Sequence, residues 1–178
     1  LNMYGFSKLA FDNYVRNILP KSESQVVGLR YFNVYGPQEN HKKRMASVAF
    51  HLFNQLNNSG KMSLFEGSVG FLRDFIFVLD AVKINLYFYE SNTSGIYNAG
   101  TGKAHSFFEI AEIMKNLNGG GEIENIAFPD DLKGKYQKFT EADLTNLRKA
   151  GYDKDFYPLE DGLSQYFNIL TSNNGLYI

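Results

Sequence analysis

Residues 25–37 read QVVGLRYFNVYGP, and the interpretation of the whole chain starts from this stretch. The segment from Gln25 to Phe32 is short, apolar and β-branched, which predicts a buried strand. The polar segment from Asn33 to Lys43, with its Gly36-Pro37 turn, predicts a loop directly after that strand. Ligands of open α/β sheets bind beyond the carboxyl ends of the strands, so we expect functional residues in this loop.

The segments on both sides alternate between helix and strand. Helices are predicted over residues 4–19, 45–56, 80–89, 106–117, 140–150 and 159–170, and strands over 62–65, 72–78, 95–98 and 123–128. Ser106 and Glu109 form a capping-box pattern at the start of one helix. The Gly119-Gly120-Gly121 run follows that helix, which indicates a turn and not a phosphate-binding loop. The alternation predicts an α/β fold with parallel strand pairing.

The composition excludes several classes of protein. With 18 Lys and Arg against 19 Asp and Glu, the formal net charge is −1, so nucleic acid and anionic membranes are not expected partners. The absence of cysteine excludes a thiol nucleophile and a disulfide framework. The histidines (His41, His51 and His105) are far apart, so we expect no metal site. No signal-peptide pattern or long apolar run is present, so we expect a cytoplasmic protein without membrane insertion.

Tyr4 and Lys8 lie four residues apart in a predicted helix, and therefore on one face of it. A fixed ammonium beside a phenol favours the phenolate, and such a pair can take a proton from an alcohol while a hydride leaves its carbon. The spacing alone also fits an ordinary exposed Tyr and Lys one turn apart. Farther along, Arg73-Asp74 offers either a structural ion pair or an arginine suited to bidentate contact with a phosphate.

Four stretches occur in order along the chain: YGFSK at 4–8, LRYFNVYGP at 29–37, RDFIFVLD at 73–80 and YNAGTG at 97–102. Together they resemble the extended short-chain dehydrogenase/reductase family of nucleotide-sugar epimerases and dehydratases, in its C-terminal half. The glycine-rich dinucleotide motif and the catalytic Ser or Thr of that family are absent. The chain also starts at Leu1. We therefore expect a piece of a longer protein, inactive by itself.

This resemblance implies the C-terminal half of a doubly wound Rossmann-type NAD(P)-binding domain plus a small mixed α/β substrate-binding domain. The Rossmann segments would be residues 1–37 and 72–100, and the substrate-domain segments 38–71 and 101–178.

Further stretches are similar to the heptose 6-epimerases of this family. They include 41–42, 45–52, 64–68, 128–130, 132–137, 140–148 and 150–154, whereas Arg44 stands where the family often has a small polar residue. The resemblance implies NADP-dependent inversion of ADP-heptose at C6 through a transient ketone, in lipopolysaccharide inner-core precursor synthesis. The full-length enzyme would be a homo-oligomer.

By the same resemblance, Tyr4 and Lys42 are the two catalytic acid/base residues. Inversion requires proton transfer in two orientations of the ketosugar, which one rigid side chain serves poorly. Lys8 and Val34 would contact the cofactor. The substrate-binding residues would be Asn33, Lys42, Arg44, His51, Phe65, Glu66, Gly67, Ser68, Arg73 and Tyr136.

Two alternatives remain open. The protein could be another epimerase or dehydratase of the same family, acting on a different nucleotide sugar. The chain could also be a non-catalytic nucleotide-sugar-binding module. Comparing the protection against heat by ADP and by UDP discriminates between the members of the family.

Overall fold

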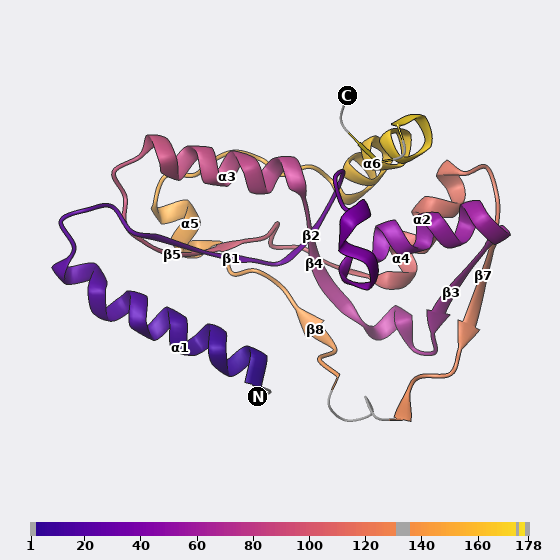
Figure 1. Ribbon diagram of the computed structural model, residues 1–178, viewed down its shortest axis with the longest axis horizontal. Helices are drawn as coiled ribbons and strands as arrows, with labels where there is room; N and C mark the ends of the chain where they lie inside the picture. Colours follow the sequence, from indigo (N-terminus) through magenta and orange to yellow (C-terminus); the bar gives the residue numbers. More distant parts are fainter. Residues whose placement is uncertain (1–2, 131–135, 174, 177–178) are drawn as a thin grey trace.

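The computed structural model describes residues 3–130, 136–173 and 175–176 of the chain. At one end, β1 (Val27–Tyr31) and β5 (Gly95–Ala99) pair in parallel, as Figure 1 shows. Helix α1 (Met3–Ile18) lies on one side of this pair and α3 (Val78–Glu90) on the other. A short 3-10 helix, η1 (Leu19–Lys21), follows α1 and contains Pro20, a residue that cannot continue an α-helix. The predicted helices and strands in this region are confirmed in position. Strand β1 is, however, half-buried to exposed rather than buried as predicted, because among the described residues it has only one neighbouring strand, β5.

The chain after β1 differs from the prediction, because Asn33 does not begin a loop. Phe32 donates its N–H to Ala99 and leaves the first sheet. The next residues form β2 (Asn33–Tyr35), which runs parallel to the end of β4 (Leu72–Phe77). The polar Asn33 fits in a strand because its side-chain amide donates to the backbone oxygen of Asp74, at 3.0 Å. One continuous segment thus passes from the first sheet to the second.

Strand β4 is the centre of the second sheet. It pairs with β2 in parallel, with β6 (Ala104–Ser106) antiparallel, and with β8 (Phe139–Thr140) in parallel. The helix predicted over 140–150 is therefore wrong at its start, and α5 covers only Thr145–Lys149. Tertiary contacts override the local helical pattern here, since β8 pairs with β4 and Ala142 donates its N–H to buried Asp74.

The other end of the molecule is a helical layer packed on a third sheet. Strands β3 (Lys61–Phe65) and β7 (Glu122–Ile126) pair in parallel, so β3 and β4 do not pair with each other across the turn between them. Helices α2 (Val48–Ser59), α4 (Phe107–Leu117) and α6 (Leu159–Asn173) pack together beside these strands (Figure 1). Two 3-10 helices, η2 (Asn40–Met45) and η3 (Ser68–Gly70), lie in the connections.

The buried side chains form two apolar clusters, one at each end. The first joins β5, α3 and the α5 region, with Ile84, Tyr97 and Leu147 among its members. The second lies between α2, α4, α6 and the strands beside them, around Leu52, Met114 and Leu163. Leu147 packs in the first cluster, although the expected domain division assigns residues 101–178 to the substrate domain. That division stays a prediction.

The predicted capping box of α4 is confirmed. Ser106 accepts a hydrogen bond from the N–H of Glu109, and the Glu109 carboxylate accepts one from the N–H of Ser106. Across the described ranges, no helix combines the length and apolarity needed to cross a membrane.

Candidate functional site

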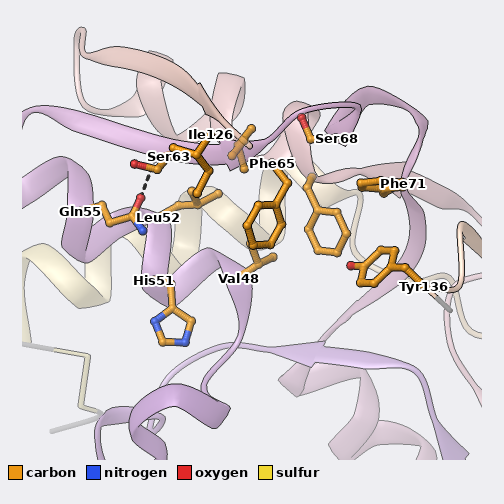
Figure 2. Close-up of a pocket in the computed structure, with 12 residues that line it drawn as sticks. Val48, His51, Leu52, Gln55, Ser63, Phe65, Ser68, Phe71, Ile126 and Tyr136 are labelled. Carbon is orange, nitrogen blue, oxygen red and sulfur yellow. Dashed lines mark hydrogen bonds between the residues drawn. The ribbon is translucent and has the colours of Figure 1, made fainter. Parts of the chain in front are cut away.

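A pocket of about 170 Å³ lies between α2, β3, β7 and the start of α4. Figure 2 shows its walls, with Gln55 at one end and Tyr136 at the other. Four of the substrate-binding residues predicted from the sequence line it: His51, Phe65, Ser68 and Tyr136. The other lining residues are mostly apolar: Val48, Leu52, Gln55, Ser63, Leu64, Phe71, Phe107 and Ile126.

Helix α2 provides one wall of this pocket. Its first turn is capped by Ser47, whose hydroxyl oxygen accepts the N–H of Phe50. Val48, His51, Leu52 and Gln55 follow at helical spacing and so share one face. Gln55 in turn accepts the N–H of Ser63 at 2.8 Å, which fastens the helix to β3 (Figure 2). The cap and this cross-link together fix the position of α2 beside β3, with His51 among the residues that line the pocket.

Aromatic rings form the opposite wall. Phe71 lies with its ring centre 4.9 Å from that of Tyr136 and 5.3 Å from that of Phe128, and Phe65 packs edge-on against Phe128 at 5.5 Å. Sequence reasoning did not select Phe71 or Phe107 for the site. Phe71 directly follows η3 and belongs to no stretch quoted for the resemblance, so only its contacts identify it. These rings are tilted or edge-on to one another, and an apolar aromatic wall of this kind suits an aromatic ligand group.

Arg73 stands directly behind this wall. Its side chain is nearly buried, and the guanidinium lies 5.1 Å from the ring centre of Tyr136 and 5.9 Å from that of Phe107. It donates hydrogen bonds to the backbone oxygens of Leu72 and Gln137. The cation–π contacts with these rings stabilise the nearly buried guanidinium of Arg73. Its positive charge and planar donors suit a phosphate group.

The structural ion pair considered for Arg73 and Asp74 is not what the structure shows. Neighbouring strand residues point to opposite faces of the sheet. Asp74 is completely buried, and its carboxylate accepts hydrogen bonds from Thr101, Gly102 and Ala142. Arg73 and Asp74 therefore have separate roles, the first near the pocket and the second in the fold.

The remaining predicted substrate residues are not among those that line the pocket. Glu66 and Gly67 are exposed in the turn before η3, where Gly67 adopts a left-handed conformation with φ +81. Lys42 and Arg44 are on η2, with exposed side chains. The Lys42 ammonium lies 3.7 Å from a carboxylate oxygen of Glu39.

Tyr4 and Lys8 line a different hollow, of about 450 Å³, between α1 and β1. The Lys8 nitrogen is 5.2 Å from the centre of the Tyr4 ring, and Tyr4 is 70% exposed. Val34, predicted to contact a cofactor, packs against the first apolar cluster.

The structure thus brings His51, Phe65, Ser68 and Tyr136 into one cavity, and Tyr4 with Lys8 into another. Within the described residues, no group of three or more metal-ligating side chains is found.

Comparisons with known proteins extend this picture. Residues 1–100 match the family model described as the NAD dependent epimerase/dehydratase family. ADP-L-glycero-D-manno-heptose-6-epimerase from Helicobacter pylori is similar over 96% of this chain, with 34% identity and a TM-score of 0.82, and 52% of that protein is covered. UDP-N-acetylglucosamine 4-epimerase from Methanobrevibacter ruminantium is similar over 95%, with 24% identity and a TM-score of 0.81, and 53% of it is covered.

UDP-glucose 4-epimerase from Thermus thermophilus shares the fold over 96% of this chain, at 21% identity and a TM-score of 0.79, with 54% of it covered. The chain therefore spans about half the length of the structures it matches. The expected Rossmann-like α/β fold is confirmed. Because the family model matches more than half of the chain, the conclusion is direct: this chain belongs to the NAD-dependent epimerase/dehydratase family.

Proposed function

We propose that this chain is the C-terminal part of an enzyme that inverts C6 of ADP-D-glycero-D-manno-heptose, giving the L-glycero epimer. The observation that carries the proposal is the pocket in which His51, Phe65, Ser68 and Tyr136 come together. These residues come from stretches similar to heptose 6-epimerases, and the Helicobacter pylori heptose epimerase is 34% identical to the chain. Use of NADP, homo-oligomeric assembly and a place in lipopolysaccharide precursor synthesis are parts of the proposal that rest on the resemblance. A cytoplasmic location is a further part of it.

The size of the pocket limits what it holds. Sites for drug-sized ligands are typically ~300–1,000 Å³, so a pocket of about 170 Å³ fits one ring system of a nucleotide sugar rather than the whole molecule. The aromatic wall suits a flat base or the apolar face of a sugar. Ser68 and His51 supply polar atoms beside that wall. Arg73 would contact the diphosphate, because a guanidinium carries five N–H donors and the structure shows two hydrogen bonds from it to backbone oxygens, those of Leu72 and Gln137.

The hollow beside α1 is suited to part of the dinucleotide that the family uses. It is lined by Tyr4, Lys8, Asp12 and Arg30, so hydroxyl-bearing and charged groups have partners there. Tyr4 and Lys8 would hold the reactive end of the cofactor there, and the cofactor would supply the reversible acceptance of a hydride from C6. Tyr4 would take the proton from the C6 hydroxyl as the ketone forms, and the Lys8 ammonium would stabilise the phenolate.

Lys42 would serve as the second acid/base, on the other face of the ketone. In the full-length protein, Tyr4→Phe and Lys42→Met should each lower the epimerisation rate by ~10²–10⁴, the usual range for a general acid/base. Cofactor binding should persist in Lys42→Met. The matched control is Lys43→Met, which removes the neighbouring exposed lysine and should keep a near-normal rate. Equal rates for the two lysine variants would contradict the assignment of Lys42.

The nucleotide is tested by thermal unfolding with ADP and with UDP at equal concentrations. A ligand at 100 times its Kd stabilises the folded state by ~2.7 kcal/mol, which is a readily measured shift in Tm. We expect the larger shift with ADP. A larger shift with UDP would instead favour a different nucleotide-sugar epimerase or dehydratase. Nucleotide binding without turnover by the full-length protein would indicate a non-catalytic binding protein.

A further inference from the structure

A buried carboxylate organises the loop between β2 and α2. Glu39 is only 3% exposed. Its carboxylate accepts the N–H of Ser47 and the Ser47 hydroxyl, both at 2.7 Å, the N–H of Gly36 at 3.3 Å, and the Tyr166 hydroxyl at 3.2 Å. These donors come from the end of β2, the cap of α2 and the middle of α6. One side chain thus fastens both ends of the loop to the helical layer.

The same carboxylate holds Lys42. The Lys42 ammonium lies 3.7 Å from Glu39 Oε2, and the Lys42 N–H donates to the Glu39 backbone oxygen at 2.8 Å. The side chain of Lys42 is 42% exposed while that of Glu39 is 4% exposed. The Lys42 ammonium therefore has a buried carboxylate on one side and solvent on the other.

The backbone around this pair is also unusual. Gln38 has φ 72 and Lys43 has φ 52, so two non-glycine residues that flank Glu39 and Lys42 adopt left-handed values. Such conformations are strained and persist only where surrounding contacts determine them. The N–H of Gln38 donates to Gly175, and the Lys43 oxygen accepts from Ala46. Together with the Glu39 carboxylate, which binds Gly36 and Ser47 on either side, these bonds make the loop a defined structure.

We propose that Glu39 is a positioning residue that sets the place and direction of the Lys42 ammonium. This inference rests on the proposed role of Lys42 as the second acid/base. A lysine side chain is long and flexible, and without a fixed partner its ammonium samples many positions. Proton transfer depends strongly on orientation, so a fixed carboxylate at its base raises the fraction of productive arrangements. Burial and the adjacent Glu39 raise the pKa of Tyr166, which keeps its phenol protonated as a donor to this carboxylate.

The test is a double-mutant cycle in the full-length protein. Glu39→Gln replaces one carboxylate oxygen by an amide NH₂, which removes the charge facing Lys42. We expect kcat to fall about tenfold or more while KM changes little, because Glu39 does not touch the substrate. In the Lys42→Met background, Glu39→Gln should cause no further loss of kcat, because the residue through which it acts is gone.

Tyr166→Phe is the control, since it removes one hydrogen bond to the same carboxylate and leaves the charge in place. It should lower Tm slightly and leave kcat near normal. A Glu39→Gln protein that has a lower Tm but an unchanged kcat would overturn the proposal and leave Glu39 with a structural role. An equal loss of kcat in both the wild-type and Lys42→Met backgrounds would overturn it as well.

Glu39→Asp covers the case in which the glutamine variant does not fold. It keeps the charge but withdraws the carboxylate by one methylene from Lys42, and the same loss of kcat is expected. If neither variant folds, the role is structural and the proposal fails. If Lys42→Met itself keeps a normal rate, the assignment of Lys42 under the proposed function fails, which is a distinct outcome.

Discussion

Asp74 is the buried charge on which the centre of the fold depends. It lies in β4 and is completely buried. Oδ1 accepts the N–H and the hydroxyl of Thr101, both at 2.8 Å, while Oδ2 accepts the N–H of Gly102 at 2.8 Å and that of Ala142 at 3.1 Å. The turn after β5 and the segment after β8 are both fastened to β4 by this one side chain.

Asp74→Asn changes only one of the two oxygens. The remaining amide oxygen can still accept from Thr101, but the new NH₂ faces the N–H groups of Gly102 and Ala142, which are themselves donors. Two hydrogen bonds to a charged acceptor are lost, at roughly 1.5–3 kcal/mol each. Allowing for partial relaxation and non-additivity, we expect a loss of about 3–4 kcal/mol. That is a large part of the ~5–15 kcal/mol by which proteins are stable.

The assay is equilibrium urea unfolding of the Asp74→Asn protein beside the parent. The matched control is Asp143→Asn, the same chemical change at an exposed aspartate that accepts one N–H from Thr145. The control should shift the urea midpoint little. A loss of less than about 1 kcal/mol for Asp74→Asn, within the ordinary range for unremarkable substitutions, would refute this reasoning about the buried carboxylate.

Two further predictions concern α4 and the pocket. Partial burial opposes ionisation of Glu109, but hydrogen bonds from Ser106 and His105 outweigh it and lower the pKa of Glu109. The ionised Glu109 therefore stabilises the folded protein at pH values above its unfolded-state pKa of roughly 4.3. This stabilisation is lost as the pH falls through the lower pKa that Glu109 has in the folded state. In Glu109→Gln the side chain keeps the capping geometry but does not titrate. The urea midpoint of this variant should therefore fall less than that of the parent between about pH 6 and about pH 3. An equal fall of the two midpoints over this range would contradict the prediction. Tyr136→Leu removes the ring beneath Arg73, a contact worth ~0.5–2 kcal/mol. The Kd for ADP measured by calorimetry should therefore rise roughly two- to thirtyfold, and an unchanged Kd would exclude the ring from the site.

Elements whose signals are local were predictable from the sequence. The capping box of Ser106 and Glu109 involves residues three apart, and the helix that follows it begins where expected. The short apolar strand β1 and the amphipathic helices α2 and α6 are likewise determined by spacing within one segment. Membership of the family was indicated by four short stretches in order, because side chains close in sequence carry that signal.

Elements that depend on distant partners were not predictable in this way. Asn33–Tyr35 has a polar start and is a strand only because Phe75–Phe77 lies beside it. Residues 140–144 have helical spacing, yet Thr140 pairs with Arg73. The same applies to Glu39, whose donors Ser47 and Tyr166 lie 8 and 127 residues away in sequence.

The amino-acid sequence by itself thus determined the α/β class, most helix and strand positions and the candidate residues of the site. Only the tertiary structure decided which of those residues share a cavity. It added Phe71 and Phe107 to that cavity, and it placed the buried Glu39 beside Lys42. The physical reason is that periodicity and capping act within one segment of chain. A pocket wall or a buried carboxylate is instead made by side chains that meet only when separate segments pack.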